Sequence, residues 1–210
     1  MFDLYAITPE RSPDAIERGV ALLLTAAEPA RIAVLLRAKH LSLTERRALG
    51  RALRTRTAQC GAALLVSAEL ELCAELDADG VQLPERGPSI AQARAELGAA
   101  CLIGASRHDA AGLSLAAAQG ASFATLSPVF ASPGKDEPLG TAHFAALTRQ
   151  AALPVVALGG IEPQHVAGLV RSGAAAIAVI RGVFDHSDPG AAALAYLAEI
   201  DRARVALRDS

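Results

Sequence analysis

Eight short apolar runs, separated by longer segments of helical spacing, constrain the fold of this chain more than any other feature. Segments between the runs, such as residues 12–27 and 163–173, place apolar side chains three and four positions apart. Runs that are apolar on both faces are typical of a parallel sheet covered by helices. The pattern therefore predicts an α/β protein in which strand and helix alternate eight times. The runs occupy residues 2–7, 32–36, 62–66, 80–83, 101–105, 122–126, 154–158 and 176–180.

Eight strand–helix units in 210 residues predict a single-domain (β/α)8 TIM barrel that spans residues 1–210. The alternative is an open, doubly wound sheet, but no Gly-x-Gly-x-x-Gly motif follows the first run. No linker or low-complexity segment divides the chain. The longest irregular connection, residues 127–140, is expected to be functional, as long loops in compact barrels usually are.

Composition argues against several classes of function. Aromatic residues make up only 3% of the chain and Trp is absent, so no stacking platform for nucleic-acid bases is expected. The basic stretch 31–56 is followed by the acidic stretch 69–79, and we expect neighbouring outer helices to pair their charges instead of binding RNA. With no signal peptide and no apolar run suited to a bilayer, the sequence predicts a cytoplasmic protein without a nucleic-acid or membrane partner. The oligomeric state stays open, a homo-oligomer included.

Two adjacent glycines, Gly159 and Gly160, follow the seventh run, and Ile180, Arg181 and Gly182 follow the eighth. In barrels the active site lies at the carboxyl ends of the strands, and the loops after strands seven and eight often hold a phosphate. One explanation of the glycines is a tight turn, which glycine permits. The other is a pair of N–H groups left open to an anion at a helix start, with a guanidinium close by. The second explanation predicts an anion site between the two loops.

Polar side chains also follow the second, fifth and sixth runs, at the same end of the predicted barrel. Several cations and hydroxyls that meet at one mouth suit a phosphorylated small molecule. Taken singly, an exposed Lys or Arg is usually solvated and a lone His is often structural. The candidates are Arg37, Lys39, Ser106, His108, Ser127, Ser132 and Lys135.

Seven stretches, in this order and spacing, carry a resemblance that covers nearly the whole chain. They are "LYAIT" (4–8), "RAK" (37–39), "ADGVQLP" (78–84), "IGASRH" (103–108), "SPVFASPGK" (127–135), "PVVALGGI" (154–161) and "GAAAIAVIRGVF" (173–184). Together they resemble the thiamine phosphate synthase family, which includes the thiazole tautomerases called TenI. The resemblance implies a (β/α)8 barrel that holds a thiazole phosphate at the loops after strands seven and eight.

The resemblance implies Mg²⁺ only if the chain is a synthase, because synthases use the metal to bridge a pyrimidine pyrophosphate to acidic side chains. The first acid of the family lies in an Asn-Asp-Arg sequence, where this chain has Ser67, Ala68 and Glu69. The second acid aligns with Gly87, and a usual Gln aligns with Leu35. Alanine and glycine offer no side-chain oxygen to Mg²⁺. We therefore expect neither a bound metal nor another cofactor.

Three functions follow from the resemblance, and the first is the main prediction. The sequence "VQLP" is closer to the tautomerase branch, which moves a proton within a carboxylated thiazole phosphate without a metal. That branch's usual His aligns with Pro128, so His108 is the expected proton carrier, with Ser106 and Lys39 as the other candidate catalytic residues. The alternatives are a synthase with relocated carboxylates and a catalytically silent sensor of a phosphorylated ligand. The carboxylates that could be relocated are Glu69, Glu71 and Glu85.

Overall fold

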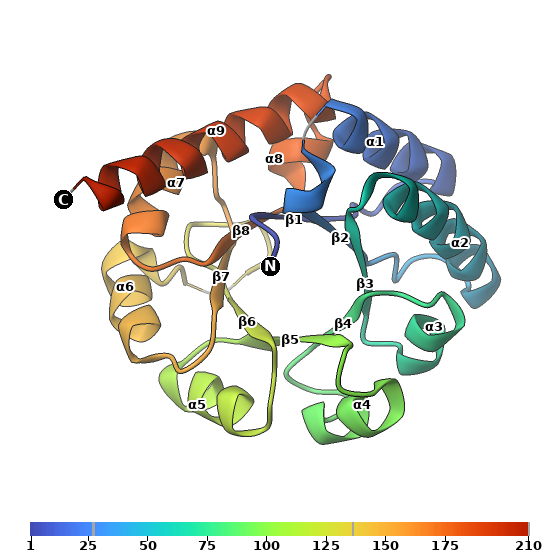
Figure 1. The fold of residues 1–210 in the computed structure, drawn as a ribbon, viewed down its shortest axis with the longest axis horizontal. Helices are drawn as coiled ribbons and strands as arrows, with labels where there is room; N and C mark the ends of the chain where they lie inside the picture. The colour runs from blue at the N-terminus through green and yellow to red at the C-terminus, as the bar shows by residue number, and fades with distance from the viewer. Residues whose placement is uncertain (27, 136, 210) are drawn as a thin grey trace.

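Eight parallel strands close into a barrel surrounded by helices, as the sequence pattern predicts (Figure 1). The computed structural model describes residues 1–26, 28–135 and 137–209. Neighbouring strands pair in chain order, and β8 returns to β1, where Ile177 pairs with Leu4. The strands are β1 (Leu4–Ile7), β2 (Ile32–Leu36), β3 (Ala63–Ser67), β4 (Gly80–Leu83), β5 (Leu102–Arg107), β6 (Phe123–Leu126), β7 (Val155–Leu158) and β8 (Ala176–Val179).

The helices cover the outside of the barrel, and several begin at side-chain caps. Ser42 and Glu45 form a reciprocal capping box at the start of α2, and Asp109 accepts from the Gly112 N–H at the start of α5. Within the described part of the chain, no helix has the length and hydropathy that a bilayer span requires. The helices are α1 (Pro13–Ala26), α2 (Leu43–Cys60), α3 (Leu70–Glu75), α4 (Ile90–Leu97), α5 (Ala110–Ala118), α6 (Gly140–Gln150), α7 (Pro163–Arg171), α8 (Arg181–Phe184) and α9 (Pro189–Arg208), and a 3-10 turn covers Pro29–Arg31.

Strand β5 is longer than the sequence predicts. Its ladder continues through Ser106 and Arg107, which pair with Thr125 and Leu126 of β6, so Ser106 lies on the strand and not after it. Ser106 and Arg107 are polar, so they do not extend the apolar run that predicts the strand. The strand ladder continues through them because it is formed by backbone groups. The consequence is functional, because strand residues alternate in direction: Ser106 lines the interior, whereas Arg107 packs against the start of α5.

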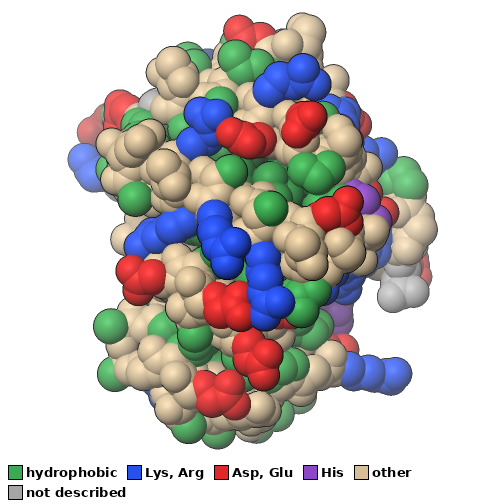
Figure 2. Space-filling model, turned by 90° about the vertical axis from the view of Figure 1, so that its right-hand side faces the viewer, with side chains coloured by type: hydrophobic (Ala, Val, Ile, Leu, Met, Phe, Trp, Pro, Cys, Tyr) green, Lys and Arg blue, Asp and Glu red, His purple; other side chains and the backbone are tan. Residues whose placement is uncertain are grey.

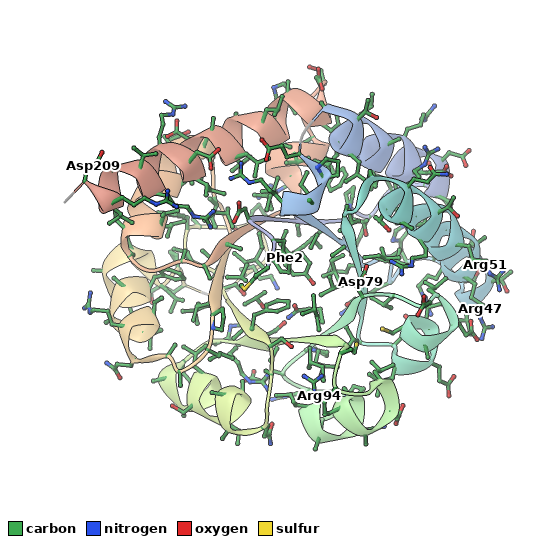
Figure 3. All side chains as sticks on the ribbon, in the orientation of Figure 1. Phe2, Arg47, Arg51, Asp79, Arg94 and Asp209 are labelled. Carbon is green, nitrogen blue, oxygen red and sulfur yellow. The ribbon has the colours of Figure 1, made fainter. Side chains whose placement is uncertain are left out.

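The interior of the barrel is closed by aromatic rings. Phe2, Tyr5 and Phe123 meet with ring centroids 5.0 to 5.8 Å apart, and the Phe123 ring lies at nearly a right angle to both of the other rings. Phe2 lies near the centre of the strand ring in Figure 3. A separate and larger core, which includes Leu4 and Leu64, fills the space between the strands and the helices. The rings fill one part of the barrel, and any ligand must enter elsewhere.

The face that carries α2 and α3 has interleaved charges of both signs (Figure 2). Arg47 of α2 binds Glu75 of α3 at 2.6 Å, and Arg54 binds Asp79 at 2.9 Å. The predicted pairing between the basic stretch and the acidic stretch is therefore present. Because the charges alternate, this face presents no uniform basic surface, and the absence of nucleic-acid binding stays a prediction.

A charged cluster fastens the start of β1 to the last helix. The Asp3 carboxylate accepts from Arg31 at 2.7 Å and binds Arg204 of α9 at 2.7 Å, and Arg31 also binds Asp201 at 2.6 Å. Burial alone would raise the pKa of Asp3, but the hydrogen bonds and positive charges of Arg204 and Arg31 outweigh it and hold the pKa below its usual value. The ionised carboxylate therefore stabilises the fold.

Replacing Asp3 with asparagine should lower the free energy of unfolding by roughly 2–3 kcal/mol at pH 7, because two arginines lose a largely buried partner. A depressed pKa gives stability that is present above the unfolded value, near about 4, and is lost as the pH falls through the folded value. The difference between the two proteins in urea unfolding should therefore shrink below about pH 4.

Asp209 provides the control, because it lies exposed at the end of α9 (Figure 3). Asp209→Asn should change the free energy of unfolding by less than about 0.5 kcal/mol at either pH. A difference between wild type and Asp3→Asn that stayed constant from pH 7 to pH 3 would contradict the role assigned to the ionised carboxylate.

Candidate active site

A cavity of about 1090 Å³ opens at the carboxyl ends of the strands. Its volume is slightly above the range of about 300–1,000 Å³ that is usual for small-molecule sites, so a phosphorylated heterocycle fits. Every site residue predicted from the sequence lines this cavity, although their contacts with a ligand stay a prediction. These residues are Arg37, Lys39, Ser106, His108, Ser127, Ser132, Lys135, Gly159, Gly160, Ile180, Arg181 and Gly182.

Gly159 and Gly160 are required by backbone geometry. Their φ angles are 107° and 61°, in a region that side chains disfavour. A Cβ on Gly159 would lie 2.7 Å from Pro128 Cα, and one on Gly160 would lie 2.5 Å from the Ala131 carbonyl oxygen. The turn explanation is therefore correct. Open amides accompany it, since neither glycine N–H donates a backbone hydrogen bond to a described residue.

Replacing Gly160 with alanine should therefore lower the free energy of unfolding by about 3 kcal/mol, because left-handed strain adds to a backbone clash. Gly120 is the matched control, since it has φ 82° but nothing within 4 Å of an added Cβ. Gly120→Ala should cost only about 1 kcal/mol. Equal losses in urea unfolding would show that contact with the loop after β6 does not matter. A Gly160 variant is consequently a poor test of anion binding.

The second loop begins α8, a single turn that starts at Arg181. Arg181 is exposed, and its guanidinium has no ion pair with any residue in the described ranges. The first amides of a helix lack intrahelical partners, so Arg181 and Gly182 offer N–H groups beside the guanidinium. These groups line the same cavity as the Gly159–Gly160 turn. The two loops together form a candidate anion site.

Tyr196 of α9 holds both loops from beneath, and sequence reasoning missed it. Its hydroxyl donates to the Ile161 carbonyl oxygen at 2.9 Å, and a Cβ on Gly182 would overlap the same hydroxyl. Burial raises the pKa of Tyr196 to about 12, so the hydroxyl stays a donor at physiological pH. The sequence gives no signal for Tyr196, because it lies far from any strand end along the chain. Its role becomes visible only from its contact with Ile161 in the fold.

The cavity rim carries more free positive than free negative charge. Arg37 lies 3.5 Å from Glu10 and Arg11 lies 2.6 Å from Asp185, so these charges are compensated. The side chains of Lys39, Lys135 and Arg181 have no ion pair within the described part of the chain, and of the acids that line the cavity Glu85 and Glu162 have none there either. This excess of cations favours an anionic ligand.

A hydrogen-bonded group of polar side chains forms the floor of the cavity. The Gln82 Nε2 group donates to Ser106 Oγ at 3.0 Å and to Thr125 Oγ1 at 3.3 Å, and the Tyr5 hydroxyl donates to Gln82 Oε1 at 3.3 Å. Gly104 leaves room for this amide, because a Cβ there would overlap Gln82 Oε1 and the Phe123 ring. All four polar residues of the group line the cavity.

The His108 ring is oriented by the loop after β6. Its Nδ1 lies 2.6 Å from the Ser127 carbonyl oxygen. A carbonyl oxygen only accepts, so Nδ1 carries the hydrogen and Nε2 of the neutral ring has a free lone pair. The side chain is exposed and lines the cavity. His108 can therefore take a proton from a bound molecule.

The side chains present do not fit Mg²⁺. Glu69 and Glu71 line a separate outer groove, and Glu69 lies 3.0 Å from Arg46, so neither faces the cavity. Ala68 and Gly87 supply no side-chain oxygen, and of the three acids that the sequence offered as replacements Glu85 is the one that lines the cavity. The described residues hold no group of three or more His, Cys, Asp or Glu suited to a metal. Mg²⁺ is normally held by carboxylates in near-octahedral oxygen geometry.

Comparisons with known proteins agree with the architecture of this site. The family model of thiamine monophosphate synthase matches residues 4–183. A putative thiamine-phosphate synthase of Geobacter sulfurreducens is 38% identical over 204 residues, which cover 94% of this chain and 93% of that protein. A thiamine-phosphate synthase of Thioalkalivibrio sulfidiphilus is 34% identical over 204 residues, which cover 90% of this chain and 91% of that protein.

Solved structures show the same fold. A thiamine phosphate pyrophosphorylase from Pyrococcus furiosus is similar with a TM-score of 0.86 and 26% identity, over 96% of each chain. A 3-hexulose-6-phosphate synthase has a TM-score of 0.73 at 17% identity, over 95% of this chain and 100% of that one. The second likeness concerns the barrel alone.

Proposed function

Because this chain belongs to the thiamine monophosphate synthase family, a family of thiamine-biosynthesis enzymes, we propose that it binds a phosphorylated thiazole and shifts a proton within it. The proposal makes the protein a metal-independent thiazole tautomerase of the cytoplasm. One observation carries it: the cavity wall presents a histidine whose free Nε2 can accept a proton, while no group of three or more metal-ligating side chains is found among the described residues.

The proton transfer uses His108 twice. Nε2 removes a proton from one atom of the bound thiazole and returns it to another, so the ring is neutral before and after the reaction. The bond from Nδ1 to the Ser127 carbonyl keeps the ring in one orientation and stabilises the imidazolium that forms between the two steps. Lys39 and Ser106 line the same cavity and can stabilise negative charge that develops on the ligand.

The phosphate of the ligand is assigned to the two glycine loops. Gly159, Gly160 and the first residues of α8, Arg181 with its unpaired guanidinium among them, all line the cavity. Backbone amides and a guanidinium are the usual donors to phosphate oxygens. The helix dipole adds little, because α8 has only four residues. Anchoring the phosphate there places the heterocycle toward the remaining lining residues.

A second candidate, thiamine phosphate synthesis, is favoured by the names of the relatives. The relative with 38% identity is named a putative thiamine-phosphate synthase, and the relative with 34% identity is named a thiamine-phosphate synthase. For this chain, the reaction would have to proceed with another carboxylate of the cavity wall, such as Glu85, as the replacement acid. Departure of pyrophosphate needs strong charge neutralisation, which Arg37, Lys39 and Lys135 supply only in part. The donor set therefore favours the tautomerase.

Replacing Arg181 with glutamine tests the ligand assignment. Affinity for thiazole phosphate should fall about tenfold to a hundredfold, because one charged hydrogen-bond donor to the phosphate is lost. Arg171→Gln, at the exposed end of α7, should leave affinity unchanged. Isothermal titration with thiazole phosphate measures both. Unchanged affinity in Arg181→Gln would refute the phosphate site, and no binding to wild type would refute the ligand.

A further inference from the structure

We propose that Gln82 is a positioning residue that fixes Ser106 as a hydrogen-bond donor, so that the cavity floor selects a ligand with an acceptor atom at that point. The inference rests on the proposed function for the identity of the ligand. The heterocycle must then present a hydrogen-bond acceptor to the cavity floor. The acceptor is a ring nitrogen or a carboxylate oxygen.

Tyr5 determines which way the Gln82 amide points. The Tyr5 side chain is fully buried, and Gln82 is its one side-chain hydrogen-bond partner in the described residues. A buried phenol needs an acceptor for its hydrogen, because leaving that hydrogen unpaired costs about 1–3 kcal/mol. Gln82 Oε1 must therefore face Tyr5, and the NH₂ group must face the other side. In the opposite orientation Nε2 would donate to the phenol oxygen, and the phenol hydrogen would have no acceptor.

A count of hydrogens then fixes the role of the two hydroxyls. Both hydrogens of Gln82 Nε2 are used, one toward Ser106 Oγ and one toward Thr125 Oγ1. The two hydroxyl oxygens lie 3.4 Å apart, so at most one hydroxyl hydrogen is used between them. At least one hydroxyl hydrogen is left over. Thr125 is only 2% exposed and donates to Ser106, so the remaining hydrogen belongs to the half-buried Ser106.

The surplus hydrogen gives the floor a fixed preference. A ligand acceptor placed over Ser106 completes the group, because every donor then has a partner. A ligand N–H or C–H at the same place leaves the Ser106 hydrogen unpaired. Specificity of this kind comes from a buried polar group that the wrong ligand cannot satisfy.

The experiment compares three ligands by isothermal titration: carboxythiazole phosphate, the same molecule without its carboxylate, and its thiophene analogue, in which C–H replaces the ring nitrogen. In wild type, one of the two deletions should cost about tenfold in affinity, which identifies the acceptor. In Gln82→Met the cost should fall below about twofold, because nothing directs the Ser106 hydrogen. In Gln82→Glu the affinity cost of the deletion should also vanish, because the carboxylate accepts the Ser106 hydroxyl hydrogen.

Gln92→Met on the exposed face of α4 is the control and should keep the wild-type preference. Inorganic phosphate should bind all variants equally, since its site is the pair of glycine loops. If the wild type binds all three ligands with the same affinity, this inference is overturned and the proposed function stays intact. Gln82 variants that keep the full preference would have the same consequence. A wild type that binds no thiazole phosphate would overturn both.

Discussion

Replacing His108 with glutamine should slow proton exchange on the bound thiazole by about 10²–10⁴-fold, the usual contribution of a general base. Glutamine can still donate a hydrogen bond to the Ser127 carbonyl, but it cannot take up a proton. The loss should therefore appear in kcat, with affinity for thiazole phosphate changed by about twofold or less. Nuclear magnetic resonance of the substrate in deuterated water measures the exchange, and calorimetry measures the affinity.

His143 supplies the matched control for this substitution. It is exposed on α6 and does not line the cavity, so His143→Gln should keep the full exchange rate. An unchanged rate in His108→Gln would contradict the assigned base and direct attention to Lys39. Tight binding by a wild type that catalyses neither exchange nor synthesis would instead support the silent sensor.

The barrel could be predicted because its strands are buried on both faces. Runs such as residues 32–36 and 80–83 coincide with β2 and β4 residue for residue. The prediction ended β5 too early because Ser106 and Arg107 are polar, and a polar side chain on a strand end gives no apolar signal. The fold accepts both, since one lines the cavity and the other packs against α5.

The cavity lining could be predicted from topology alone, because residues just past parallel strands share one end of a barrel. Contacts between distant side chains could not. Tyr196 reaches Ile161 across 35 positions and Tyr5 reaches Gln82 across 77, and no local pattern records either. The sequence likewise does not show which way the Glu69 side chain points. In the structure its contact with Arg46 directs it to the outer groove.

With pyrimidine pyrophosphate, thiazole phosphate and Mg²⁺, the unmodified protein is expected to form little or no thiamine phosphate. A metal ion contributes several kcal/mol to such a reaction, and each 1.4 kcal/mol is about tenfold in rate. The backbone still allows an acid to return: Ala68 has φ 67°, a conformation that Asp tolerates better than Ala, and an added Cβ at Gly87 meets only the Pro84 ring.

Ala68→Asp combined with Gly87→Asp should therefore raise synthesis by about 100-fold or more, and the gain should disappear when EDTA removes the metal. Either single substitution should give much less, because one carboxylate holds Mg²⁺ weakly. The rate at which labelled thiamine phosphate forms is measured for the wild type, the two single variants and the double variant. Rapid, Mg²⁺-dependent turnover by the unmodified protein would reject the tautomerase assignment. Loss of that turnover in Glu85→Gln would then identify Glu85 as the relocated acid, because it is one of two carboxylates on the cavity wall, with Glu162, that have no ion pair within the described residues.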